Sequence, residues 1–322
     1  MAQATNTWTD NLYVITGGAG LVGQNLIVAM KATGCRNIVA IDKHKANTAI
    51  LRRLHPDIMV IEADLAIPGS WEYAFIPANG SKSVPVLLHA QIGGPDEAEF
   101  IRNNVTATEN VLNACRKAGV EYLVHASSSV VNSMAVDFYT ESKKAQEKMV
   151  DACGIAHVVL RPTLMFGWFD RKHLGWLARF MQRVPLFPIP GLGRYVRQPL
   201  YALDFCHIIM SCLQTRPTGT YDITGLGRTL YVDLIRKLRR AVRARAMLVF
   251  IPYGIFYALL WLYALFDRNP PFTRSQLRAL VTPDEFEIID WPGIFGVTAT
   301  PLDAALEATF NDPRYSGVKL EF

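Results

Sequence analysis

Cysteine is scarce in this chain and follows no recognisable pattern. The chain has 322 residues and five cysteines, an odd number, and no two of them form a Cys-X-X-Cys pair. A disulfide framework and a zinc site are therefore not expected. The histidines also lack the spacing of metal ligands, so we expect no metal site and a reducing compartment. The cysteines are Cys35, Cys115, Cys153, Cys206 and Cys212.

Targeting and linker signals are missing as well. Met1–Asn11 is polar and has neither a basic segment nor an apolar segment of the secretory type. We therefore expect a cytoplasmic protein, either free or at the inner face of the membrane. No stretch rich in Gly and Ser divides the chain, and no internal repeat occurs. With 50% apolar residues, the chain can bury one large core or two closely joined ones.

Acidic residues are absent from residues 236–245, which carry six basic ones. The net charge of +5 could suggest a nucleic-acid partner, but the excess is local to this segment. A solvated face of one basic helix explains it, and we expect no nucleic-acid partner. The basic residues are Arg236, Lys237, Arg239, Arg240, Arg243 and Arg245.

Charge of either sign is absent from residues 246–266. Pro252 and Gly254 divide this apolar stretch into a short strand and a helix of about fourteen residues, which is too short to span a bilayer. Trp261 and the neighbouring tyrosines suit a peripheral position in the membrane interface, with the preceding arginines turned toward anionic lipid. A buried helix or a dimer contact explains the same stretch equally well.

Apolar, β-branched runs alternate with helical patterns in the first half of the chain. Near-continuous apolar strands separated by amphipathic helices are typical of a parallel sheet covered on both faces. We expect an α/β fold: a Rossmann-type doubly wound parallel sheet over 1–162, to which 196–224 returns, and a smaller C-terminal α/β substrate cap over 163–322. The expected strands are 12–16, 37–42, 58–63, 84–90, 122–128 and 157–162, with further strands in PLYALD at 199–204 and TYDITG at 220–225.

Gly17, Gly20 and Gly23 follow the first expected strand and open a helix. Glycines at this spacing permit a tight turn and close approach to a pyrophosphate, whose charge the helix N-terminus attracts. Asp42 ends the second expected strand and can accept hydrogen bonds from both ribose hydroxyls of an adenosine. Because its carboxylate repels a 2′-phosphate, NAD is favoured over NADP, a preference that the nearby Lys43 and Lys45 moderate.

Tyr139 and Lys143 lie four positions apart and share one face of an expected helix. An ammonium beside a phenol favours the ionised phenol. Such a pair is a base suited to a secondary alcohol, although a surface helix pair would have the same spacing.

These motifs together resemble the extended short-chain dehydrogenase/reductase superfamily of NAD-dependent sugar epimerases, dehydratases and 3β-hydroxysteroid dehydrogenases. The resemblance covers nearly the whole chain. It is carried by TGGAGLVG at 16–23, Asp42, Ala63-Asp64-Leu65, Asn104-Val105, the serines 127–129, YTESK at 139–143, LRPTLMFG at 160–167 and RQPLYALD at 197–204.

The resemblance implies roles for individual residues. Tyr139 would take the proton of a substrate hydroxyl while hydride passes to the nicotinamide, and Lys143 would lower the phenol's pKa and hold the nicotinamide ribose. Ser129 would bind the substrate oxygen, with Ser127 and Ser128 as alternatives. Asp64 is a candidate adenine contact. The residues expected to bind the cofactor are Gly17, Gly20, Leu21, Val22, Gly23, Asp42, Lys43, Asp64, Leu65, His89, Ala90, Gln91, Asn104, Tyr139, Lys143 and Pro162.

Departures from the family pattern narrow the function. Val130 and Val131 stand where the 4,6-dehydratases carry an Asp-Glu pair, so dehydration is not expected. Tyr139 follows Ser129 by only ten positions, which predicts an open site. The tail segments 270–280 and 296–306 are similar to those of the NDUFA-nine-type accessory subunit of respiratory complex I, whose branch binds nucleotide.

Three functions remain open on the sequence. The first is an NAD-dependent epimerase or oxidoreductase acting on a sugar that is linked to a nucleotide or to a polyprenyl diphosphate. The second is a 3β-hydroxysteroid or sterol dehydrogenase, suggested by the open site and by Asn269–Phe272. The third is a non-catalytic, nucleotide-binding assembly subunit. A homodimer is common in the family that the chain resembles.

Overall fold

The computed structural model describes residues 8, 11–78, 80–132, 137–266, 277, 280, 281 and 285–321. Two stretches used above lie wholly or mostly outside these residues, namely Asn269–Phe272 and the tail segment 270–280. Residues 133–136, in the middle of the short segment between Ser129 and Tyr139, also lie outside them.

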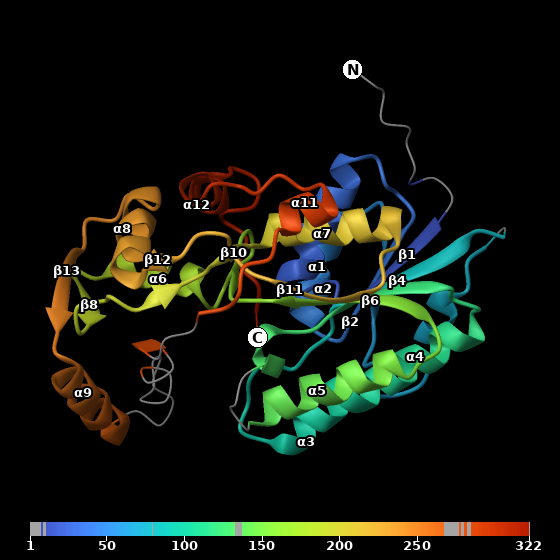
Figure 1. The fold of residues 1–322 in the computed structure, drawn as a ribbon, viewed down its shortest axis with the longest axis horizontal. Coiled ribbons are helices and arrows are strands. Elements are labelled where there is room, and N and C mark those ends of the chain that lie inside the picture. Colours follow the sequence, from blue (N-terminus) through green and yellow to red (C-terminus); the bar gives the residue numbers. More distant parts are fainter. Residues whose placement is uncertain are drawn as a thin grey trace.

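A seven-stranded parallel sheet forms the larger part of the molecule (Figure 1). Its strand order is β11-β6-β5-β4-β1-β2-β3, and every neighbouring pair is parallel. The predicted Rossmann-type α/β fold is confirmed. The strands are β1 (Asn11–Thr16), β2 (Ile38–Asp42), β3 (Met59–Glu62), β4 (Lys82–Leu87), β5 (Tyr122–Ala126), β6 (Ala156–Pro162) and β11 (Gly219–Ile223).

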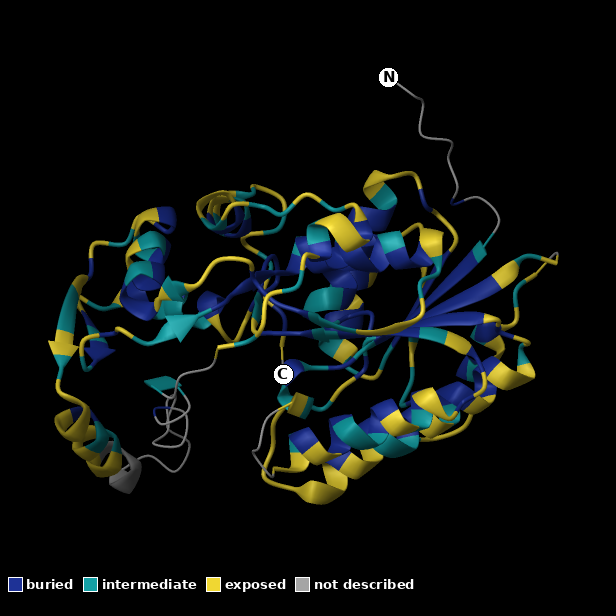
Figure 2. Ribbon diagram, in the orientation of Figure 1, coloured by how far each residue is buried: buried dark blue, intermediate teal, exposed yellow. Residues whose placement is uncertain are grey.

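The central strands of this sheet are apolar on both faces, and helices bury both faces (Figure 2). One core joins the sheet to α1 (Leu21–Ala32), α2 (Lys45–Leu54), α7 (Ala202–Thr215) and α11 (Trp291–Phe295). The core of the other face includes η1 (Ser70–Phe75), α4 (Ala107–Lys117) and α5 (Phe138–Asp151). Before α4 the chain forms α3 (Glu97–Phe100) and the π-helical turn η2 (Ile101–Thr106).

The stretch 199–204 differs from its expected strand. Only β10 (Leu200–Tyr201) is extended, and α7 begins at Ala202. The apolar residues that follow are spaced for a helix: Phe205, Ile208, Ile209 and Cys212 are all fully buried against the sheet. The local alternation at 199–204 was too short to separate a strand from a helix start.

A smaller cap lies beside the sheet at the left of Figure 1. Its own core includes Phe166, Leu174, Phe187, Leu234 and Leu306. The elements are β7 (Met165–Phe166), α6 (Leu174–Arg183), β8 (Leu186–Pro190), β9 (Val196–Arg197), β12 (Thr229–Leu230), α8 (Tyr231–Ala241), β13 (Met247–Ile251) and α12 (Leu302–Asn311).

The charge-free stretch 246–266 forms a strand and then a helix, as its sequence predicts. β13 pairs in parallel with β8, and α9 (Tyr253–Phe266) follows it at the lower left of Figure 1. Among the described residues, no helix combines the length and the apolar character needed to cross a bilayer.

Candidate active site

The turn between β1 and α1 brings backbone close to backbone. Gly17 has φ +68°. A Cβ atom there would lie 2.7 Å from the backbone nitrogen of His89, in the loop that follows β4. A Cβ atom at Gly23 would lie 2.5 Å from the carbonyl oxygen of Gly18. The turn therefore excludes side chains at both positions and leaves the N-terminus of α1 accessible to an anion.

Asp42 faces this turn from the end of β2. Its carboxylate accepts hydrogen bonds from the backbone N–H groups of Ala19, at 3.1 Å, and His44, at 2.9 Å. Burial raises the pKa of Asp42, and these backbone donors oppose the rise. The two bonds fix the carboxylate beside the glycine turn, where a ribose bound there would meet it.

A hollow of about 150 Å³ opens at the carboxyl ends of these strands. This hollow is lined by most of the residues that we expect to contact the adenosine end of the cofactor. Leu21, Val22, Gly23, Asn104, Tyr139, Lys143 and Pro162, also predicted, do not line it. The lining consists of Gly17, Gly20, Asp42, Lys43, Ala63, Asp64, Leu65, Leu88, His89, Ala90, Gln91, Asn103 and Ala107.

Leu88 and Ala107 also line the hollow. The sequence did not point to them, because they are apolar and belong to no recognisable motif. Asn103 could have been found, since it precedes the Asn104-Val105 pair. Its Oδ1 accepts a hydrogen bond from Lys43 Nζ at 2.7 Å across the hollow. Arg102 was also missed, and its guanidinium lies 2.7 Å from the Asp64 carboxylate.

His89 contributes backbone rather than a reactive ring to this wall. Its Nδ1 lies 2.7 Å from Thr16 Oγ1 and its Nε2 lies 3.0 Å from Thr108 Oγ1, so both ring nitrogens have partners. Burial, and then the charge of Lys143, lower the pKa of His89 to about 3. The imidazole is therefore neutral and structural at physiological pH.

Asn104 lies behind the hollow, fully buried in η2. Its side-chain amide bonds the Gln91 backbone and also donates to Ser142 Oγ at 2.8 Å. Ser142 in turn donates to the Tyr139 carbonyl oxygen at 2.8 Å. A chain of hydrogen bonds thus joins the wall of the hollow to α5, the helix that carries Tyr139 and Lys143.

Tyr139 lies in the first turn of α5, half-buried, with its ring centroid 6.5 Å from that of Phe100. Burial raises the pKa of Tyr139, and a side-chain hydrogen bond with Ser128 opposes the rise. Ser128, one of the two alternatives to Ser129, is therefore the serine whose hydroxyl acts on the phenol's pKa. Ser129 turns inward as the first residue of the 3-10 helix η3 (Ser129–Asn132) and is buried.

Lys143 is almost fully buried one turn farther along α5. Its Nζ donates to the carbonyl oxygen of Ala126 at 3.0 Å, at the end of β5. Burial lowers the pKa of Lys143 to about 7, and the negative charge of Glu147 opposes this effect. The phenol's raised pKa has the opposite sign to that expected from the i,i+4 spacing, because burial raises it most and the negative charge of Asp137 raises it further.

Glu147 is itself held by a fork. Arg161 on β6 donates from Nε to Glu147 Oε1 at 2.9 Å and from a terminal nitrogen to Oε2 at 2.5 Å. The same guanidinium reaches Asn132 Oδ1 at 3.3 Å, at the end of η3. This fork ties the helix of Tyr139 and Lys143 to the turn that carries the serines.

The residues present fit a dinucleotide. The glycine turn would cradle the pyrophosphate, Asp42 would take the ribose hydroxyls, and Leu65 and Ala107 would flank the adenine with apolar surface. In the parts of the chain that the structure describes, no group of three or more His, Cys, Asp or Glu side chains could hold a metal ion.

Comparison with known proteins points the same way. A family model described as "NAD dependent epimerase/dehydratase family" matches residues 13–224. A farnesyl dihydroquinoline-1-oxide ketoreductase of Stigmatella aurantiaca is 27% identical over 64% of the chain, which spans 65% of that relative. The ceramide reductase of Caulobacter vibrioides is 23% identical over 74% of the chain and 73% of its own length.

A mouse relative is named NADH dehydrogenase [ubiquinone] 1 alpha subcomplex subunit 9, mitochondrial. It is 26% identical over 60% of the chain, which spans only 52% of its length.

Solved structures share the fold over nearly the whole chain. The Bordetella bronchiseptica enzyme WbmG in complex with NAD matches with a TM-score of 0.71 at 20% identity, over 94% of this chain and 93% of that one. The UDP-glucuronic acid 4-epimerase of Bacillus cereus in complex with NAD matches with a TM-score of 0.69 at 19% identity, over 93% and 97%. The chain belongs to the NAD dependent epimerase/dehydratase family, and its cofactor is NAD.

Proposed function

We propose that this protein is an NAD-dependent epimerase or oxidoreductase that oxidises a secondary alcohol of a nucleotide-linked or polyprenyl-diphosphate-linked sugar. The observation that carries the proposal is the position of Tyr139, which lies near Ser128 at the N-terminal end of a helix that Asn104 and Ser142 tie to the cofactor hollow. A phenol and a hydroxyl at this position can bind one substrate oxygen between them.

The chemistry follows from the states of these groups. Bound NAD would supply the acceptor for the hydride of the carbinol carbon. Ser128 would donate to the substrate oxygen and orient it toward the Tyr139 hydroxyl. Because burial raises its pKa, Tyr139 holds its proton in the structure, the form that protonates a carbonyl oxygen. In the oxidising direction Tyr139 must release that proton to solvent before it can take one from the alcohol. The pKa of Lys143 is about 7, so the part of Lys143 that is protonated near neutral pH would favour this release.

The sugar class is supported by similar folds. Their names include a UDP-glucuronic acid 4-epimerase and MoeE5 in complex with UDP-glucose and NAD. A relative 22% identical over 74% of the chain is named UDP-glucuronic acid decarboxylase 4.

The test is turnover of a panel that contains UDP-glucose and UDP-glucuronic acid, with products separated by chromatography and identified by NMR. An epimerase converts one of them to its epimer with catalytic amounts of NAD. A dehydrogenase consumes NAD stoichiometrically and produces NADH. If no sugar nucleotide reacts in the presence of either NAD or NADH, the sugar assignment is contradicted.

A second candidate is a sterol-type dehydrogenase, or more broadly a redox enzyme for an apolar substrate. Two relatives are named for lipid-like substrates, a ceramide and a farnesylated dihydroquinoline. Oxidation of a 3β-hydroxysterol with release of NADH at each turnover would favour this candidate over the first.

A third candidate, a nucleotide-binding assembly subunit, is favoured only by the relative named as a subunit of NADH dehydrogenase. The same panels address it. A protein that binds NAD tightly and turns over neither sugar nucleotides nor sterols fits this candidate.

A further inference from the structure

The strand β13 and the helix α9 form an apolar surface at the end of the cap, away from the cofactor hollow (Figure 1). Seven large apolar side chains within residues 247–262 are exposed, among them Met247 at 62%, Ile255 at 56%, Leu259 at 51% and Trp261 at 50%. Figure 2 shows α9 largely in the colour of exposed residues. Scattered exposed apolar residues are ordinary, but this density on one strand and one helix indicates a binding surface.

α9 exposes most of its circumference. Of its residues up to Leu262, only Phe256 is buried, while Tyr257 and Leu260 are half-buried. Its fourteen residues correspond to about 21 Å of helix, which is shorter than the hydrocarbon core of a bilayer at about 30 Å. A helix of this length suits a position along an interface rather than across it.

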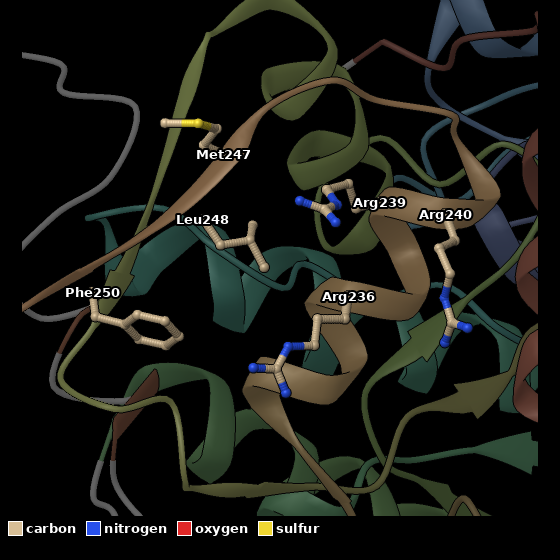
Figure 3. Close-up of a pocket in the computed structure, with 6 residues that line it drawn as sticks. All are labelled: Arg236, Arg239, Arg240, Met247, Leu248 and Phe250. Atoms are coloured by element: carbon tan, nitrogen blue, oxygen red, sulfur yellow. The ribbon is translucent and has the colours of Figure 1, made fainter.

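Arginines lie directly beside this surface. Arg236, Arg239 and Arg240 of α8 line a hollow of about 610 Å³ together with Met247, Leu248 and Phe250 of β13 (Figure 3). The arginines project from the helix on one side of the hollow and the apolar side chains from the strand on the other. The hollow thus combines guanidinium groups with apolar side chains.

Most of these arginines have no carboxylate partner among the residues that the structure describes. Arg236 lies 2.9 Å from Asp233. Within the described ranges, by contrast, no carboxylate lies within 4.0 Å of Arg239, Arg240, Arg243 or Arg245. The exposed apolar surface is therefore bordered by arginines that can bind phosphate groups.

We propose that this surface, made of α9, β13 and the arginines of residues 236–245, docks on an anionic lipid bilayer. α9 lies in the interface with Trp261 and Tyr253 at headgroup depth, and the arginines bind lipid phosphates. An apolar helix flanked by arginines is the combination that a negatively charged lipid surface attracts. A second copy is disfavoured, because a two-fold contact through this surface would bring two arginine clusters together.

The proposal is tested by sedimentation of the full-length protein with vesicles. Phosphatidylcholine vesicles are compared with vesicles that also contain phosphatidylglycerol, at low and at high salt. We expect at least tenfold tighter binding to the anionic vesicles, and a loss of that binding as salt rises because the charge contribution is screened.

Two variants remove the two parts of the surface separately. Leu259→Ser combined with Trp261→Ser removes apolar anchors, and Arg236→Glu combined with Arg240→Glu reverses charge. Both pairs are exposed, so the fold should tolerate them, and each should weaken vesicle binding at least fivefold. Ile67→Ser, at an exposed apolar residue between β3 and η1, and Arg314→Glu, at an exposed arginine, lie outside this surface and should bind like the wild type.

Three results would overturn the proposal. The first is equal binding by wild type and both double variants, and the second is no binding to anionic vesicles. The third is a concentration-dependent dimer in solution that Leu259→Ser with Trp261→Ser abolishes, which would assign the surface to a second copy. The proposal does not depend on the catalytic assignment, because Tyr139→Phe protein should bind vesicles as the wild type does.

Discussion

Asn104 holds the backbone of Gln91 from both sides. Its Oδ1 accepts a hydrogen bond from the Gln91 N–H at 2.6 Å, and its Nδ2 donates to the Gln91 carbonyl oxygen at 3.1 Å. Since the same Nδ2 also donates to Ser142, one buried amide positions both a wall of the cofactor hollow and the helix of Tyr139.

Replacement of this amide should affect cofactor binding and stability together. Asn104→Leu keeps the approximate volume but leaves the Gln91 N–H and carbonyl groups without their partner. We expect NAD affinity to fall about tenfold and the free energy of unfolding to fall by about 1–3 kcal/mol. Calorimetric titration and denaturant unfolding measure these quantities. Asn113→Leu, at an exposed position on α4, is the control. If Asn104→Leu binds NAD within twofold of the wild-type affinity, Asn104 does not position the wall of the cofactor hollow.

Asp42 should set the choice between NAD and NADP. Asp42→Asn retains an oxygen for one of the Ala19 and His44 N–H groups but removes the charge that repels a 2′-phosphate. The ratio of NAD to NADP affinity should therefore fall by roughly tenfold, which corresponds to about 1.4 kcal/mol. Asp151→Asn, which removes an exposed carboxylate, should leave the ratio unchanged. An unaltered ratio in Asp42→Asn would show that another group selects the cofactor.

Lys143 should make stability depend on pH above neutrality. Its pKa in the folded protein is lowered to about 7 from an ordinary value of 10.5. Between these values the unfolded chain binds a proton that the folded protein does not, so stability rises with pH from about 7 to about 10. The slope from this one group is at most about 1.4 kcal/mol per pH unit.

Denaturant unfolding between pH 7 and pH 9.5 measures this slope. Lys143→Met should flatten it, whereas Lys144→Met, whose lysine is more exposed on the same helix, should preserve it. The account of Lys143 fails if wild type and Lys143→Met have the same pH dependence.

Arg161 and Glu147 offer a matched comparison of two ion pairs. The Glu147 side chain is only 10% exposed, whereas in the Lys82–Glu121 pair the carboxylate side chain is 59% exposed. Arg161→Met leaves a largely buried carboxylate without its fork and should cost about 3 kcal/mol of unfolding free energy. Lys82→Met, which leaves an exposed carboxylate, should cost less than about 1 kcal/mol. Equal costs measured by thermal or denaturant unfolding would refute this distinction.

The sequence was sufficient for the sheet and the cofactor turn because both depend on local patterns. Continuous apolar runs predict buried parallel strands, and the glycines at 17 and 23 have a steric reason to be glycine. The stretch 199–204 was misassigned because a six-residue apolar run fits a strand as well as the first turn of a helix.

The side-chain partners of the candidate site could not be predicted from local pattern. Three adjacent serines are equivalent in the sequence, and only the 3-10 turn decides that Ser128 meets Tyr139 and that Ser129 turns inward. The fork from Arg161 to Glu147 joins residues 14 positions apart on different elements. Burial of Lys143, which controls its charge, likewise depends on how α5 packs against the end of β5.

The most direct test of the catalytic account compares wild type with Tyr139→Phe on whichever sugar nucleotide or sterol the panels show to react. The account predicts a loss of at least about 10³-fold in kcat, with NAD affinity within threefold of wild type, because only the hydroxyl is removed. Tyr73→Phe, at an exposed tyrosine, should be fully active. Turnover by Tyr139→Phe at the wild-type rate would contradict the account.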